Sequence, residues 1–174
     1  RPKSWENDAI SLMVDMARES KEAGDNCKVH IVHLSSDEAL ATIAQAKGEG
    51  LRFTAETCPH YLTIASENIP DGKTLFKCCP PIREDKNREH LWKAVTDGEA
   101  KDRGFTLVDL ARLMSAETAK FAGLDGIKGA IKVGNHADFC IFDENIEYTI
   151  TNDMIKHRHN ITPYAGRKVT GRVN

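Results

Sequence analysis

Apolar residues recur at three- and four-residue spacing in four stretches of the chain, the pattern of amphipathic helices. This pattern predicts helices over residues 4–24, 36–48, 84–97 and 106–122. Ser4 is placed to cap the first helix and Gly24 to end it. The residues expected to face inward from the other three helices are Leu40, Ile43, Ala44, Leu91, Trp92, Val95, Leu107, Leu110, Ala111 and Met114.

Short apolar runs between the helices predict strands over residues 28–34, 51–57, 137–142 and 148–150. In the first run Val29, Ile31 and His33 share one face, because side chains alternate along a strand. Ser35 and Glu38 then have the spacing of a helix capping box. Repeated alternation of strand and helix predicts an α/β fold with a parallel sheet.

Composition excludes several classes of protein. The 174 residues are 40% hydrophobic and 29% charged, typical of a globular domain, and the formal net charge is −2. With a pI near 6.4 the chain offers no basic surface for nucleic acid or for membranes. No apolar run reaches the length of a membrane span. The chain begins with Arg1 and not with Met, and no signal-peptide pattern follows, so we interpret the N-terminus as a cut end. We expect an intracellular protein, either cytoplasmic or in an organelle such as a peroxisome or a mitochondrion.

Five cysteines are present, an odd number, and none has the C-x-x-C spacing of a redox or zinc site. We therefore expect buried, reduced thiols at Cys27, Cys58, Cys78, Cys79 and Cys140. The glycines at 123, 126 and 129 follow a helix and lack the spacing of a dinucleotide-binding loop. The sequence contains no phosphate-binding loop of the P-loop type and no G-x-S-x-G nucleophile elbow.

His33 is the strongest candidate for chemistry, because in α/β folds functional residues lie at the carboxyl ends of strands. It is either a metal ligand or a histidine hydrogen-bonded within the core. His157 and His159 have the spacing of a metal pair, but they lie in a charged segment near the C-terminus. Cys78 and Cys79 are either a reactive pair or packing residues beside the Pro-Pro turn that follows them.

Several motifs together resemble those of the cyclic amidohydrolases, and within that superfamily those of the allantoinases. They are Val-His-Leu-Ser at 32–35, Glu-Thr-Cys-Pro-His-Tyr at 56–61, Cys-Pro-Pro-Ile-Arg at 79–83, Arg-Pro-Lys-Ser-Trp-Glu at 1–6, and Gly-Asn-His-Ala-Asp-Phe at 134–139. His157-Arg158-His159 and Thr-Pro-Tyr-Ala-Gly at 162–166 add to the likeness, which covers nearly the whole chain.

The resemblance implies a partial (β/α)₈ barrel over residues 1–125 and a β-sandwich portion over residues 126–174. It implies that His33 is a metal ligand on the sixth barrel strand and that the backbone of Cys79 contacts the substrate ring. For an intact relative it further implies two zinc ions per subunit, a homotetramer, and ring opening of the small molecule allantoin to allantoate in purine breakdown.

Two departures from the family pattern accompany these matches. The first five barrel strands, with most metal ligands, would precede Arg1. The eighth strand, with its catalytic aspartate, is missing at a join near residues 99–104, and no Ser-Asp-His occurs anywhere. A splice variant or an assembly error would produce such a join. We therefore expect no catalytic residue in this chain, weak zinc binding at best, and an incomplete barrel that is partly molten or aggregating.

Two alternatives remain open from the sequence. One is another cyclic amidohydrolase, a hydantoinase or a dihydroorotase. The other is a non-catalytic scaffold protein of the same fold, similar to the collapsin-response mediator proteins. Retention of all metal ligands in the parent protein would distinguish an enzyme from a scaffold.

Overall fold

The computed structural model describes residues 2–96 and 105–174. The chain divides into two compact units, Arg1–Gly104 and Phe105–Asn174. This division lies earlier in the chain than the expected boundary between residues 125 and 126, and the assignment of residues 126–174 to a β-sandwich stays a prediction. The expected join near residues 99–104 lies outside the described residues.

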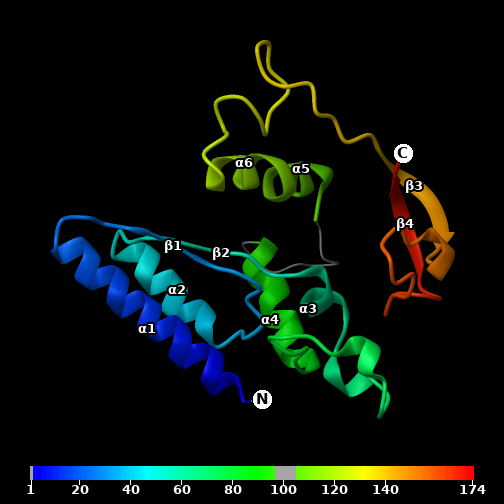
Figure 1. The fold of residues 1–174 in the computed structure, drawn as a ribbon, viewed down its shortest axis with the longest axis horizontal. Coiled ribbons are helices and arrows are strands. Elements are labelled where there is room, and N and C mark those ends of the chain that lie inside the picture. The colour runs from blue at the N-terminus through cyan, green and yellow to red at the C-terminus, as the bar shows by residue number, and fades with distance from the viewer. Residues whose placement is uncertain (1, 97–104) are drawn as a thin grey trace. The chain divides into compact units, whose positions relative to one another are not determined.

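A strand–helix–strand crossover forms the centre of the first unit (Figure 1). Strand β1 (Lys28–Ile31) and strand β2 (Arg52–Ala55) are parallel, with Val29 opposite Phe53, and α2 (Ala39–Gly48) connects them. Parallel strands need such a crossover, usually a helix. The expected α/β class is therefore confirmed, although both strands are shorter than the predicted ranges 28–34 and 51–57.

Helix α1 (Lys3–Glu22) packs along α2 and β1 and buries Ile10, Val14 and Ala17 on one stripe, as its periodicity predicts. Gly24 follows the helix with φ of +92°, a left-handed conformation that favours glycine and ends the helix. The predicted cap at Ser4 is wrong. The helix begins one residue earlier, after Pro2, and has no side-chain cap.

The rest of the first unit continues from β2 through α3 (Pro59–Thr63) and the short 3₁₀ turns η1 (Ser66–Asn68) and η2 (Thr74–Phe76) to α4 (Asp85–Thr96). Helix α4 buries Leu91, and the Trp92 indole donates a 2.6 Å hydrogen bond to the Leu62 carbonyl. The hydrophobic core of this unit consists of Ile10, Val14, Ala17, Val29, Leu34, Ala39, Ile43, Ala46, Leu51, Phe53, Tyr61 and Leu91.

Both strands of the first unit have an open edge. Within residues 2–96, β1 and β2 pair only with each other, so one side of each strand lacks a hydrogen-bonded neighbour. Sheet edges of this kind are normally paired or covered in folded proteins. An isolated pair of strands is also marginal unless helices pack against it, as α1 and α2 do here.

The second unit begins with a continuous helical stretch made of α5 (Leu107–Ala111), the wider-wound π-helical turn η4 (Arg112–Ala116) and α6 (Glu117–Phe121). Strands β3 (Phe142–Thr149) and β4 (Lys168–Val173) pair antiparallel, with η5 (Asn152–Met154) between them. The predicted strand at 148–150 is therefore the end of a longer strand.

Three expectations for the second unit are wrong. Residues 137–142 do not form a buried strand, because β3 starts at Phe142 and the preceding residues are exposed. Leu107 and Met114, expected to face inward, are exposed. The common cause is that no other described element of residues 105–174 covers these side chains. Ala119 is the one apolar residue in that described range that is buried.

Cysteine burial was also overestimated. All five thiols are free, but Cys27, Cys79 and Cys140 are exposed, and only Cys58 and Cys78 are partly buried. The apolar neighbours that suggested burial belong partly to exposed stretches such as residues 137–142. Among the described residues, no helix is long and apolar enough to cross a membrane.

The most exposed apolar side chains lie in the second unit, where Ile131 is 90% and Val133 101% exposed. Apolar surface of this kind favours association between chains. We expect Ile131→Lys with Val133→Lys to reduce light scattering by the purified chain. The first unit should keep its stability within about 0.5 kcal/mol, because both positions are on the surface. Fluorescence of Trp5 and Trp92 reports unfolding of that unit.

The matched control adds the same two charges at exposed polar positions of the second unit, Ser115→Lys with Asn160→Lys. Equal loss of scattering in both double variants would show that net charge, not the apolar pair, controls association.

Candidate functional site

The candidate site lies where β1 and β2 end. Beyond the strands the two chain segments stay hydrogen-bonded, since the Glu56 amide donates to the Ile31 carbonyl at 2.9 Å and the Leu34 amide to the Glu56 carbonyl at 2.8 Å. The Thr57 hydroxyl donates to the Leu34 carbonyl at 2.7 Å. The residues that follow each strand are therefore held side by side at one end of the sheet.

His33 lies in this connection and not within the strand. The strand ends at Ile31, and His33 has φ of +51°, in the left-handed region that non-glycine residues seldom occupy. The predicted common face of Val29, Ile31 and His33 is therefore wrong for His33, because the alternation stops before it. Its side chain is exposed, so it is not a hydrogen-bonded core histidine. Backbone strain of this kind clusters at functional sites.

Two further histidines, His30 in β1 and His60 in α3, lie near this end of the sheet. His60, in α3, packs its ring edge-on against Tyr61 at 4.2 Å between centroids. Burial lowers the pKa of His60, and the nearby charge of His33 lowers it further. His30 contacts the neighbouring strand, since its Nδ1 lies 2.8 Å from the Thr54 hydroxyl. Its Nε2 is 3.4 Å from a Glu56 carboxylate oxygen.

The segment 79–83 lies against the same turn. Cys79 is exposed, and the peptide bond between Cys79 and Pro80 is cis. The Tyr61 hydroxyl donates to the Pro80 carbonyl at 2.7 Å, and the Ser35 hydroxyl lies within 3.1 Å of the Pro81 carbonyl. These contacts fix the backbone of residues 79–83 relative to the residues that follow His33.

A groove of about 430 Å³ runs between α1, β1 and this segment. Its lining is mostly apolar, and it consists of Pro2, Trp5, Glu6, Ala9, Ile10, Met13, His30, Ile31, Val32, Cys79, Pro80, Pro81 and Arg83. Cys79 thus lies at a concave surface, and the expected contact of its backbone with a small molecule stays a prediction.

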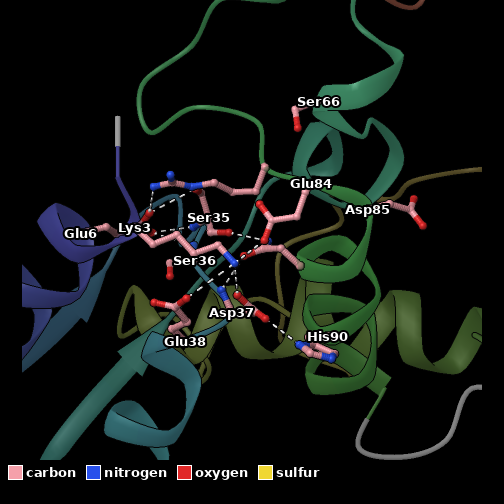
Figure 2. Close-up of polar contacts among 12 residues, drawn as sticks. Lys3, Glu6, Ser35, Ser36, Asp37, Glu38, Ser66, Glu84, Asp85 and His90 are labelled. Carbon is pink, nitrogen blue, oxygen red and sulfur yellow. Dashed lines mark hydrogen bonds and ion pairs between the residues drawn. The ribbon is translucent and has the colours of Figure 1, made fainter.

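Polar side chains missed by the sequence analysis hold this region together (Figure 2). The predicted capping box of Ser35 and Glu38 is wrong, since α2 begins only at Ala39 and has no side-chain cap. The buried amides of Ser35 and Ser36 donate instead to the carboxylate of Glu6, at 2.7 and 3.0 Å. A partner 29 residues away in sequence leaves no local signal.

Asn87 supplies a second long-range contact. Its fully buried amide group accepts from the Asp37 N–H at 2.9 Å and donates to the Ser35 carbonyl at 2.8 Å. The turn after His33 is thereby fastened to α4 as well as to α1.

A charged cluster joins the start of α1 to α4, with Lys3 between Asp37 at 2.7 Å and Glu84 at 2.5 Å (Figure 2). His90 Nδ1 lies 2.5 Å from the other oxygen of Asp37. Burial opposes ionisation of Asp37, but hydrogen bonds from Lys3 and His90 outweigh it and hold its pKa below the usual value. A lowered carboxyl pKa stabilises the fold at neutral pH, and this contribution disappears as the pH falls through that pKa.

Residues 11–173 of the chain match the amidohydrolase family. The chain belongs to the amidohydrolase family. Three curated relatives are allantoinases, from Streptomyces avermitilis at 38% identity, Saccharomyces cerevisiae at 36% and Arabidopsis thaliana at 34%. The matches cover 98%, 99% and 99% of this chain but only 46%, 46% and 44% of the relatives. The chain thus spans about half the length of the relatives it matches.

The alignment with the Streptomyces avermitilis protein runs over 211 residues, more than the 174 of this chain. That amidohydrolase therefore carries residues inside the matched region that have no counterpart here. Among solved structures, the L-hydantoinase (dihydropyrimidinase) from Arthrobacter aurescens matches with a TM-score of 0.87 at 24% identity, and a D-hydantoinase from a Bacillus species with 0.83 at 25%. Each match covers 99% of this chain and 47–48% of the other.

Amidohydrolases are generally metal-dependent, but the described residues do not form a metal site by themselves. In residues 2–96 and 105–174, no three side chains of His, Cys, Asp or Glu are grouped closely enough to hold an ion. A catalytic zinc site needs about three protein ligands. Neither His33 nor the exposed pair His157 and His159 is part of such a group among the described residues.

The effect of the His33 charge on the pKa of His60 gives a test that requires no metal. We expect His33→Gln to raise the pKa of His60 towards its ordinary value, because the repulsive charge is removed while burial remains. NMR titration of the histidine ring signals of the 174-residue chain measures this change. His90→Gln should leave His60 unaffected. An unchanged His60 titration in the His33 variant would show that the two rings are not neighbours.

Proposed function

We propose that this chain is the C-terminal part of an allantoinase-type amidohydrolase. In this proposal β1 and β2 are two strands of a (β/α)₈ barrel and residues 126–174 belong to a β-sandwich. The position of His33 supports it most directly. The side chain is exposed at the carboxyl end of a parallel strand, where barrel enzymes place their functional residues. The three relatives reported above, at 34–38% identity, are allantoinases.

The proposed reaction of the whole protein is hydrolysis of an amide bond in the hydantoin ring of allantoin. Water adds to the ring carbonyl, the carbon–nitrogen bond breaks, and the leaving nitrogen takes a proton to give allantoate. We assign His33 as one ligand of the metal site and the backbone of Cys79 as a contact to the substrate ring. The catalytic aspartate of the family has no counterpart in this chain, which should be inactive alone.

The remaining properties of the intact protein follow from the same proposal. They are zinc as the metal, a homotetramer as the assembly, and allantoin as a small-molecule substrate. A hydantoinase or dihydroorotase activity is the competing assignment. The hydantoinase structures support it only at the level of fold, because their identity to this chain is 24–25%.

A substrate panel tests the proposal. The protein to use is the full-length gene product, by which we mean the longest chain encoded by the gene that contains these 174 residues. It is loaded with zinc and assayed on allantoin, hydantoin and dihydroorotate. We expect kcat/KM to be highest for allantoin. Preference for hydantoin or dihydroorotate would replace the assignment by the competing one, and no turnover of any substrate would favour the scaffold alternative.

A further inference from the structure

Glu6 makes four polar contacts with a single carboxylate, and they divide between its two oxygens. Oε1 accepts from the amides of Ser35 and Ser36, at 2.7 and 3.0 Å. Oε2 lies 3.1 Å from the Ser35 hydroxyl and 3.1 Å from Nη2 of Arg83. Oε1 therefore holds the turn that follows His33, and Oε2 connects that turn to Arg83 at the end of the 79–83 segment.

The Ser35 hydroxyl strengthens the second connection. It accepts from Nε of Arg83 at 3.0 Å, and its single proton can be donated to Glu6 or to the Pro81 carbonyl, both 3.1 Å away. The guanidinium of Arg83 thus contacts Glu6 directly and through Ser35. The backbone of residues 79–83 is fixed by the same group of side chains as the backbone beside His33.

The charges of Glu6 and Arg83 are well shielded from water, with side chains 12% and 8% exposed. Buried charges persist when they are paired and hydrogen-bonded. A carboxylate suits this position because it only accepts, and each of its four neighbours donates or can donate. A glutamine would keep the Oε1 contacts but would turn its NH₂ group towards Arg83 and the Ser35 hydroxyl.

We infer that Glu6 is a positioning residue that joins the His33 turn to the 79–83 segment, so that the two are held as one rigid piece. The roles of these segments, a metal ligand and a substrate contact, rest on the proposed function. The connection between them is seen directly in the contacts of Glu6 and in those of Ser35 with Arg83 and Pro81. Oε1 contacts only the amides of the His33 turn, whereas Oε2 contacts both Arg83 and the Ser35 hydroxyl, so the contacts of the two oxygens can be disturbed separately.

Three variants distinguish the contacts of the two carboxylate oxygens of Glu6. Glu6→Gln removes the acceptor on the Arg83 side and keeps the one on the amide side, whereas Glu6→Ala removes both. Glu38→Gln is the matched control, since this carboxylate lies nearby but is largely exposed and contacts neither segment.

The first measurement uses the 174-residue chain without metal or substrate. Hydrogen exchange of the Ser35 and Ser36 amides reports the His33 turn, and the alkylation rate of partly buried Cys78 reports the segment beside Arg83. We expect Glu6→Gln to speed Cys78 alkylation about tenfold, the effect of losing a charge-assisted hydrogen bond. It should keep both amides protected, whereas Glu6→Ala should release both reporters. Exposed Cys140, in the other unit, should not respond.

The second measurement uses the full-length gene product. Glu6→Gln should raise the KM for allantoin and leave zinc content and kcat near the parent values. Glu6→Ala should also lower zinc content and kcat. Equal behaviour of Glu6→Gln and Glu38→Gln in both measurements would overturn the inference. Unprotected Ser35 and Ser36 amides in the parent chain would also overturn it. The same holds if both Glu6 variants lose amide protection, zinc and soluble protein together.

The two measurements also distinguish failure of the inference from failure of the proposed function. If the parent protein does not hydrolyse allantoin but Cys78 alkylation responds as expected, the assignment of substrate fails and the role of Glu6 stands. If the parent hydrolyses allantoin but the Glu6 variants match the control, the inference fails alone.

Discussion

Replacement of His33 by alanine in the full-length gene product is expected to abolish most of the allantoinase activity that we propose for it. In metal sites, loss of a hydrogen-bond partner outside the ligand sphere already costs 10- to 100-fold, so loss of a ligand should reduce kcat by at least about 100-fold. The zinc content after dialysis should fall in parallel. Thermal stability should change little, because the side chain is exposed.

His60→Ala is the control for this experiment, because His60 lies near His33 but has no ligand role in our assignment. We expect it to retain zinc and to lose less than about tenfold in kcat, within the range of an indirect effect. If the His60 variant loses zinc as completely as the His33 variant, the assignment of the ligand is wrong.

Asn87→Ala should produce a large loss of stability in the first unit. The buried amide satisfies the Asp37 N–H and the Ser35 carbonyl, and alanine would leave both without their partner. An unsatisfied buried group costs about 1–3 kcal/mol, so two of them should lower the free energy of unfolding by about 2–6 kcal/mol. Urea unfolding followed by tryptophan fluorescence measures it, since both tryptophans lie in this unit.

The control is Asn68→Ala, which removes the same side chain from an exposed position in η1. Its effect should stay within about 0.5 kcal/mol, as is usual for surface substitutions. A similar loss in both variants would mean that the contacts of Asn87 do not stabilise the fold.

Local sequence patterns predicted the elements of the first unit well, because those elements bury their own apolar stripes. Ile10, Val14 and Ala17 recur at helical spacing and do pack against the core. The alternation of strand and helix indicated a parallel sheet, which β1 and β2 form. The family motifs pointed to His33 and Cys79, whose roles remain predictions.

The pattern failed where long-range contacts decide local structure. The capping box at Ser35 was plausible by spacing, but the Glu6 carboxylate takes both amides and α2 starts later. The left-handed backbone of His33 could not be read from alternation, which assumes that the strand continues. Glu6 lies 77 residues before Arg83, and Ser35 lies 52 residues before Asn87, so no local pattern marks these contacts.

In the second unit the pattern predicted burial wrongly because covering elements are lacking there, not because long-range contacts replace local ones. Its apolar residues have the spacing of a core, but within residues 105–174 little is present to bury them. Met114 and Phe139 are 68% and 64% exposed although the pattern places both inward. Periodicity predicts which face of an element would be buried, and it does not say whether a partner exists.

The central claim is that this chain carries part of an allantoinase site and not the whole of it. Allantoate formation by the purified 174-residue chain, with zinc added, tests this most directly when measured beside the full-length gene product and a zinc-only control. We predict turnover by the full-length protein and none by the 174-residue chain above zinc alone. Turnover by the 174-residue chain that is lost in His33→Ala would contradict the account, because it would show a complete site within these residues.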